Sequence, residues 1–178
     1  MTSDHPGHDS RSSRATTTAR SYRFQRSLRL PGASAAQLGR FHLDTDNFRH
    51  LVMPTTRVVR TPSPDVRPGS TFTVEMRELG FWPIHWPGIW RVVDPNHRLV
   101  DELERPTFPF ARWRHEHRFE DTAGGALLTD QVWFAPMMPR ALRVASPLVA
   151  FGIRLYLSLM FAWRHRITAR RLAATARH

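Results

Sequence analysis

The sequence predicts an α+β fold in which a curved antiparallel sheet of seven strands wraps around one long C-terminal helix. Three observations lead to this prediction. An alternating segment comes first and precedes two short helical segments, six further strand-like segments follow with short turns, and the chain ends in one long helical segment. Consecutive strands with short turns form an antiparallel meander, and one long helix must bury an apolar side against it.

The N-terminal part supplies the first strand and both short helices. Apolar side chains alternate with polar ones over residues 22–30, and Pro31-Gly32 ends the pattern. Residues 34–41 and 45–51 each open with a Ser or Thr, which suits the N-cap of a helix.

The next strands are expected at residues 56–60, 70–79 and 89–93. Before the last of these lies the Trp- and Pro-rich segment 80–90. Pro87-Gly88 within it is expected to break or bulge any strand, because Pro cannot donate to a sheet and Gly weakens one.

Two further strands form a hairpin with the clearest alternation in the chain. A strand at 99–104 and a Pro-containing loop at 105–111 come first, followed by strands at 112–120 and 126–134 around the turn 121–125. In 112–120, arginines and glutamates point one way, while rings and imidazoles point the other. Such a pattern is typical of a sheet with one wet face.

The last element is a helix from Ser146-Pro147 to about residue 174, roughly 40 Å long. Its first half is apolar nearly all round, so we expect other elements to cover it. Because Arg143 and Arg154 interrupt the apolar residues, the runs between charges are too short for a bilayer span.

Composition narrows the chemistry. The 178 residues predict one domain over 21–172, with a disordered tail at 1–20 and a frayed end at 173–178. All 26 basic residues are Arg, and there is no Cys. This excludes disulfides, thiolate chemistry, a Schiff-base lysine and a P-loop lysine, and we expect no cofactor.

The net charge of +11 is concentrated at the C-terminus, where residues 139–178 hold eight Arg and no acid. Together with Phe81, Trp82 and Trp86, this basic helix predicts transient contact with an anionic membrane. We do not expect nucleic acid as a partner, since no binding module is recognisable. The N-terminus lacks an apolar signal, so the protein is expected to be cytoplasmic.

His115, His117 and Asp130 are the sharpest chemical signal. The two His share one strand face, and Asp130 lies on the next strand and faces the same way. They could form a His–Asp general base, a metal site, a polar anchor for a ligand, or a structural hydrogen-bond network. Because His-x-His alone is an unspecific signal, no metal is expected.

Several motifs carry a resemblance to a known family. They are Trp-x-His-x-His-x-Phe at 113–119, Gly124-Gly125, Thr129-Asp130 with Val132, and the sequence Phe-Ala-Trp-Arg-His at 161–165. The chain resembles the Bet v 1-like, START-related superfamily, also called SRPBCC or polyketide cyclase/dehydrase-like, and a bacterial subgroup within it. Trp163 departs from the Tyr usual there.

The resemblance implies a helix-grip fold with a cavity between the sheet and the helix. It implies a small-molecule binder or carrier for an apolar ligand such as a lipid, quinone or polyketide, or alternatively a cyclase or dehydratase that uses His115 or His117 with Asp130. Arg164 and His165 would hold an anionic head group. The expected cavity lining is Trp113, Phe119, Phe72, Val74, Met76, Val132, Phe134, Phe151, Leu155, Ser158, Ala162, Arg164 and His165.

Overall fold

The structure, a computed structural model, describes residues 20–60 and 65–175. Nearly all of the predicted tail 1–20, and residues 176–178, lie outside this part. The elements in chain order are β1 (Tyr22–Pro31), α1 (Ala35–Leu43), α2 (Thr45–Leu51), β2 (Thr56–Arg60), β3 (Thr71–Glu78), β4 (Trp82–Asp94), β5 (Arg98–Leu103), β6 (Phe110–Thr122), β7 (Gly125–Pro136), η1 (Arg140–Ala145) and α3 (Ser146–Thr175).

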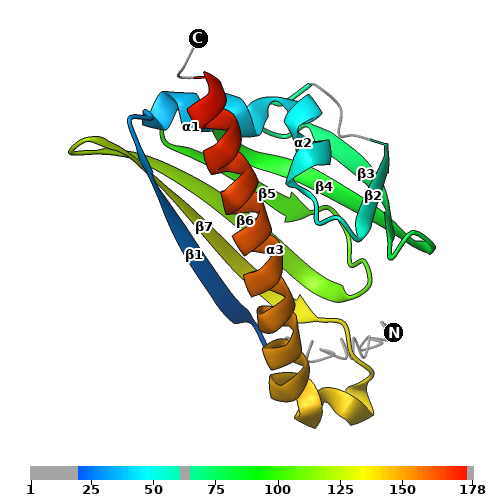
Figure 1. The fold of residues 1–178 in the computed structure, drawn as a ribbon. Coiled ribbons are helices and arrows are strands. Elements are labelled where there is room, and N and C mark those ends of the chain that lie inside the picture. The colour runs from blue at the N-terminus through cyan, green and yellow to red at the C-terminus, as the bar shows by residue number, and fades with distance from the viewer. Residues whose placement is uncertain (1–19, 61–64, 176–178) are drawn as a thin grey trace, which may run out of the picture.

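The strands form one antiparallel sheet of seven in the order β1-β7-β6-β5-β4-β3-β2. The meander from β2 to β7 places β7 next to β1, and α3 crosses the concave side of the sheet (Figure 1). This confirms the predicted fold class, including the two short helices after the first strand. The helix ends at Thr175, close to the predicted end at about residue 174.

Strand β4 corrects one prediction, because it runs without a break through Pro87-Gly88. The Pro87 carbonyl accepts a hydrogen bond from the Glu104 amide, just after the end of β5. The Pro87 nitrogen, which carries no hydrogen, faces the same way, so no hydrogen bond of the β4–β5 ladder is lost. The ring of Phe72 lies over Gly88, where any Cβ would overlap it. The irregularity in β4 falls instead between Trp90 and Val92.

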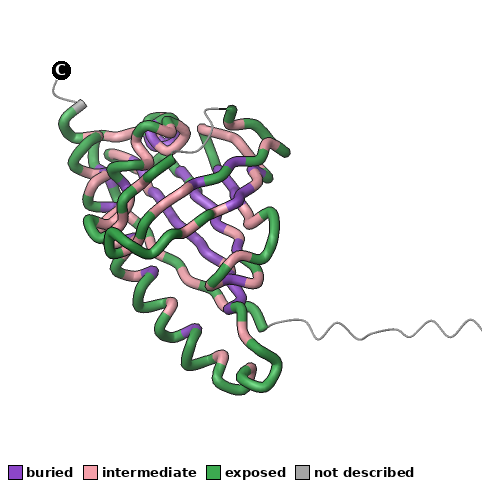
Figure 2. Tube along the Cα trace, turned by 90° about the vertical axis from the view of Figure 1, so that its right-hand side faces the viewer, coloured by how far each residue is buried: buried purple, intermediate pink, exposed green. Residues whose placement is uncertain are grey.

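The N-terminal half of α3 corrects a second prediction, because other elements do not cover it (Figure 2). Leu148, Phe151 and Leu159 are 74%, 67% and 60% exposed. The helix packs mainly against β1, β7 and α2, so the sheet reaches only one side of it. The segment Arg140–Ala174 is long and apolar enough to cross a membrane, and only 17% of its most apolar stretch is buried.

Polar contacts fix the line of α3 along β1. The Tyr22 hydroxyl lies 2.8 Å from Ser146 Oγ at the start of the helix. Near the middle of the helix, the Arg26 guanidinium donates to the Ser158 carbonyl over 3.4 Å. The core therefore divides along the helix into a cluster around Leu38, Leu99 and Leu128, and a second one around Trp113, Phe134 and Phe161.

Helix α1 tests how closely the elements pack. The Gly39 backbone approaches the Pro95 carbonyl so closely that a Cβ would overlap it, whereas Gly152 in α3 has open space around it. We expect Gly39→Ala to lower the free energy of unfolding by about 2 kcal/mol, because backbone must move to make room.

The matched change Gly152→Ala should raise the free energy of unfolding by about 0.5–1 kcal/mol through helix propensity alone. Urea unfolding of both variants checks the pair. Equal effects at the two glycines would contradict the packing of α1 against the β4–β5 turn.

Candidate functional site

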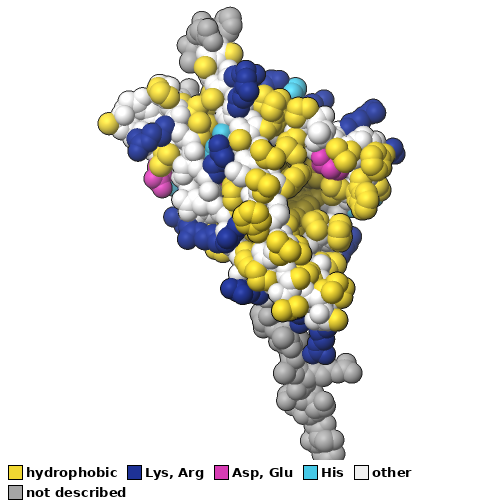
Figure 3. All heavy atoms as spheres, turned by 60° about the horizontal axis from the view of Figure 1, so that its bottom comes forward, with side chains coloured by type: hydrophobic (Ala, Val, Ile, Leu, Met, Phe, Trp, Pro, Cys, Tyr) yellow, Lys and Arg dark blue, Asp and Glu magenta, His cyan; other side chains and the backbone are white. Residues whose placement is uncertain are grey.

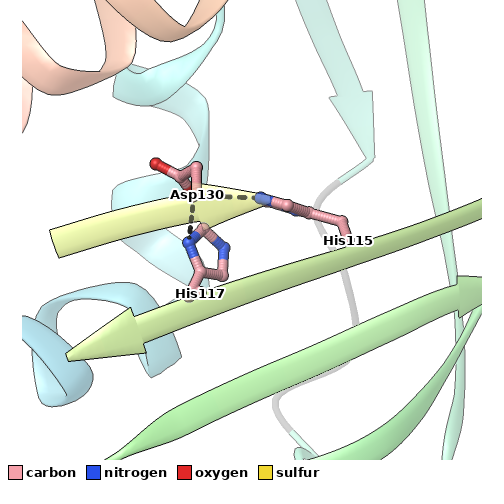
Figure 4. A group of neighbouring side chains, drawn as sticks. All are labelled: His115, His117 and Asp130. Carbon is pink, nitrogen blue, oxygen red and sulfur yellow. Dashed lines mark hydrogen bonds and ion pairs between the residues drawn. The ribbon is translucent and has the colours of Figure 1, made fainter. Parts of the chain in front are cut away.

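Three imidazoles surround the buried carboxylate of Asp130. Asp130 of β7 accepts a hydrogen bond at Oδ1 from His115 Nε2 over 2.9 Å, and its Oδ2 lies 2.6 Å from His165 Nε2. His117 Nδ1 lies 2.6 Å from the same Oδ1 (Figure 4). The side chains of Asp130 and the three His are each at most 6% exposed. We call these four residues the Asp130 cluster.

The strand register assembles most of this cluster. His117 is paired with Asp130 across β6 and β7, and His115, two residues away, points to the same face. His115 is also paired with Asp101 of β5, and its Nδ1 lies 3.3 Å from the Asp101 carboxylate. His115 therefore bridges two carboxylates, while His165 is brought in by α3.

Burial and charge set different protonation states within the cluster. Burial opposes the charging of His115, but the contacts with Asp101 and Asp130 outweigh it and raise the pKa of His115. Burial and then the neighbouring charge of His115 lower the pKa of His117 to about 4. Burial would raise the pKa of Asp130, but the surrounding imidazoles hold it well below its ordinary value. At neutral pH the cluster thus holds a neutral His117 beside an ionised Asp130.

A fourth imidazole extends the cluster toward α1. The ring of His42 lies 4.6 Å from the ring of His117, and burial, followed by the charge of His117, lowers the pKa of His42 well below its ordinary value. His42 Nε2, His117 Nδ1 and His165 Nδ1 are buried and have no hydrogen-bond partner among the described residues. His117 Nδ1 is close to the Asp130 carboxylate but lies outside hydrogen-bond geometry.

The donor atoms of His115, His117 and Asp130 all lie within 4.8 Å of one another, a set that could hold a metal ion. Two observations favour a hydrogen-bonded network instead. Both ring nitrogens of His115 already face carboxylates. The positive charge of Arg164 also acts on the carboxylates of Asp130 and Asp101, which opposes the binding of a cation there.

Most of the predicted lining residues face the interior. Trp113, Phe119, Phe72, Val74, Val132, Phe134 and His165 are buried, and Met76, Ser158, Ala162 and Arg164 are half-buried. Phe151 and Leu155 are corrections, since they are 67% and 58% exposed. They sit on the side of α3 that faces away from β1 and β7, because Ala150, Leu157 and Phe161 occupy the side that meets the sheet.

The tryptophans of segment 80–90 separate into two groups. Trp86 points inward, where its ring meets the rings of Trp113 and Phe110 edge-on at 5.1 and 5.8 Å. Phe81 and Trp82 are 69% and 55% exposed at the turn between β3 and β4. Of the three residues expected to contact a membrane in this segment, Phe81 and Trp82 are therefore placed to touch a surface outside the protein, and Trp86 is not.

An apolar hollow opens beside the N-terminal half of α3 (Figure 3). The helix packs on β1 and β7, and Trp86, Leu103, Ile153 and Met160 pack against the second core cluster while they remain only partly buried. A separate hollow of about 480 Å³ lies between α2 and the basic half of α3, with Trp163 and Ile167 in its wall. A third, of about 450 Å³, lies near Trp133 and Arg114, and neither of these two contains the Asp130 cluster.

Two members of the site escaped sequence reasoning. Asp101 follows Leu99 by two residues in β5 and therefore points inward with it. An acid at such an inward position is the sequence feature that could have identified it. His42 follows Leu38 by four residues in α1 and shares its inward face. His165 was expected to hold a ligand head group, and the structure instead pairs it with Asp130.

The low pKa of His117 makes a prediction about stability. Its pKa is 6.5 in an unfolded chain and about 4 here, so the unfolded chain binds the proton more tightly. This stabilisation is fully present above pH 6.5 and is lost as the pH falls toward 4. His117→Gln, neutral at every pH, should remove on the order of 3 kcal/mol of that dependence, measured by urea unfolding at several pH values.

The exposed His85 gives the control for this measurement. His85→Gln should leave the pH dependence of the free energy of unfolding as it is in the wild type. If His117→Gln and the wild type lose stability equally between pH 6.5 and 4, the neutral state assigned to His117 is wrong.

Comparison with solved structures places the fold. The two-domain aromatase/cyclase StfQ from the steffimycin biosynthetic pathway matches 86% of this chain with a TM-score of 0.68 at 14% identity, and the chain spans 52% of StfQ. A Rhodobacter sphaeroides protein matches 85% of this chain, and 93% of its own length is covered, with a TM-score of 0.67 at 15% identity.

A third solved structure, Ara h 8.0201, matches 84% of this chain, and 98% of its own length is covered, with a TM-score of 0.57 at 13% identity. No protein-family model and no curated protein matches the chain. At these identities the likeness concerns the fold. The chain has the helix-grip, Bet v 1-like fold of the SRPBCC and polyketide cyclase-like proteins.

Proposed function

We propose that this protein is a cytoplasmic binding or carrier protein that holds one apolar small molecule, of the lipid, quinone or polyketide class, in the hollow beside α3. The observation that carries the proposal is the set of inward-facing aromatic and aliphatic side chains that α3 leaves partly uncovered. An apolar wall with few polar groups is typical of a small-molecule site.

The polar groups of this site would come from the Asp130 cluster. The ring of His115 lies 6.2 Å from the ring of Trp113 and 5.2 Å from that of Phe161, so the Asp130 cluster borders the second core cluster. A buried imidazole nitrogen without a partner costs about 1–3 kcal/mol. A carbonyl or hydroxyl oxygen of a ligand would satisfy such a nitrogen, so the ligand should combine a large apolar body with one such group.

Filling the hollow tests the proposal. Ile153 is half-buried against the second core cluster, whereas Leu148 on the same helix is 74% exposed. We expect Ile153→Trp to weaken the saturable binding of 8-anilinonaphthalene-1-sulfonate, read by fluorescence, roughly tenfold, because the larger ring occupies the site. Leu148→Trp is the matched control and should bind the probe as the wild type does.

Mass spectrometry of the denatured wild-type protein should also release one apolar small molecule per chain. That molecule should be missing from Ile153→Trp and present in Leu148→Trp. Unsaturable probe binding in the wild type, or equal affinity in the Ile153→Trp variant, would count against the carrier function.

One observation favours a second function, a cyclase or dehydratase. His117 stays neutral near pH 7 beside the ionised Asp130, which is the state that a general base requires. In such an enzyme the imidazole would take a proton from carbon next to a ketone, Asp130 would stabilise the imidazolium, and ring closure by aldol addition would follow.

This alternative is tested with an aromatic β-polyketide mimic that cyclises with a change in absorbance. His117→Gln should lower the cyclisation rate about 10²–10⁴-fold while binding of the mimic is retained. His85→Gln should leave the rate unchanged. A rate with the wild-type protein no higher than without it would remove the enzymatic alternative and leave the carrier function standing.

A further inference from the structure

The N-terminal half of α3 carries an apolar stripe on its outer side. Leu148, Phe151, Leu155 and Leu159 follow one another at spacings of three and four residues and therefore share one helix face. They are 74%, 67%, 58% and 60% exposed. Contiguous exposed apolar surface of this kind marks an interaction site.

The charges around the stripe have one sign. Residues 139–178 hold eight Arg and no acid, so no acidic residue of this segment offsets them. Arg140 lies before the stripe and Arg154 beside it, and Arg166 and Arg170 follow about two and three turns after it. All four are exposed. An apolar helix face bordered by arginines fits the interface of an anionic bilayer, where apolar side chains enter the acyl boundary and cations meet lipid phosphates.

Phe81 and Trp82 form a second exposed group, at the β3–β4 turn, where they are 69% and 55% exposed. Figure 3 shows further hydrophobic side chains around the hollow. Aromatic side chains of this type are favoured at the membrane interface.

We propose that the outer face of α3 docks on the surface of an anionic lipid bilayer, with Leu148, Phe151, Leu155 and Leu159 inserted and the flanking arginines on the headgroups. The helix lies along the surface and does not span the bilayer, because Asp130 holds His165 and Arg26 holds Ser158, which keep its other face on the sheet. The inference stands on exposed residues alone and does not depend on the ligand proposed above.

Vesicle sedimentation tests the docking. The full chain is mixed with vesicles of phosphatidylcholine alone or with 30% phosphatidylglycerol, at low and at high salt. We expect sedimentation with the anionic vesicles and little with the neutral ones, and weaker binding at high salt. Leu155→Ser should weaken the binding roughly tenfold through lost apolar insertion.

Val59→Ser is the matched control, because Val59 is 56% exposed on β2, away from the stripe, against 58% for Leu155. It should bind as the wild type does. Equal sedimentation with neutral and anionic vesicles, or wild-type binding by Leu155→Ser, would overturn the proposal. So would sedimentation velocity showing a wild-type dimer that Leu155→Ser dissociates, because a second copy of the chain would then cover the stripe.

Discussion

The fold depends on one buried carboxylate. Asp130 is 1% exposed, and a charge so far from water is tolerated only when hydrogen bonds and opposite charge compensate it. His115 and His117 from β6 and His165 from α3 provide that compensation, so the same contact stabilises the carboxylate and ties the helix to the sheet.

The contact between Asp130 and His165 divides α3 into two halves with different surroundings. The half around His165 is held at the sheet by Asp130, whereas the half before Ser158 reaches beyond it and is largely exposed. One side of this exposed half borders the hollow beside the sheet, and the outer side presents the apolar stripe. One arrangement of the helix would therefore provide both the proposed ligand site and the proposed membrane-docking surface.

Strand alternation was sufficient to predict the sheet. In β6, Trp113, His115, His117 and Phe119 alternate with charged residues, and all four are buried as expected. The prediction failed at Pro87-Gly88, because whether Pro interrupts a sheet depends on where the neighbouring strand ends. Strand β5 ends at Leu103, before the position at which the ladder would require an N–H donor from Pro87. A local pattern does not contain that information.

The candidate site was only partly predictable for the same reason. His115 and Asp130 were found because they lie on neighbouring strands of one hairpin, whose register follows from the turn. Asp101, His42 and His165 come from three other elements, and their approach to the cluster depends on how β5, α1 and α3 pack. Phe151 and Leu155 were placed inside because an apolar helix was assumed to be fully covered, and the width of the sheet decides otherwise.

The most direct test of this account is a double-mutant cycle between strand and helix. The free energy of unfolding is measured for the wild type, Asp130→Asn, His165→Gln and the double variant. If the carboxylate holds α3 on the sheet, the sum of the two single losses in the free energy of unfolding should exceed the loss in the double variant by about 1–3 kcal/mol. Losses that add to within about 0.5 kcal/mol would contradict the central role of this contact.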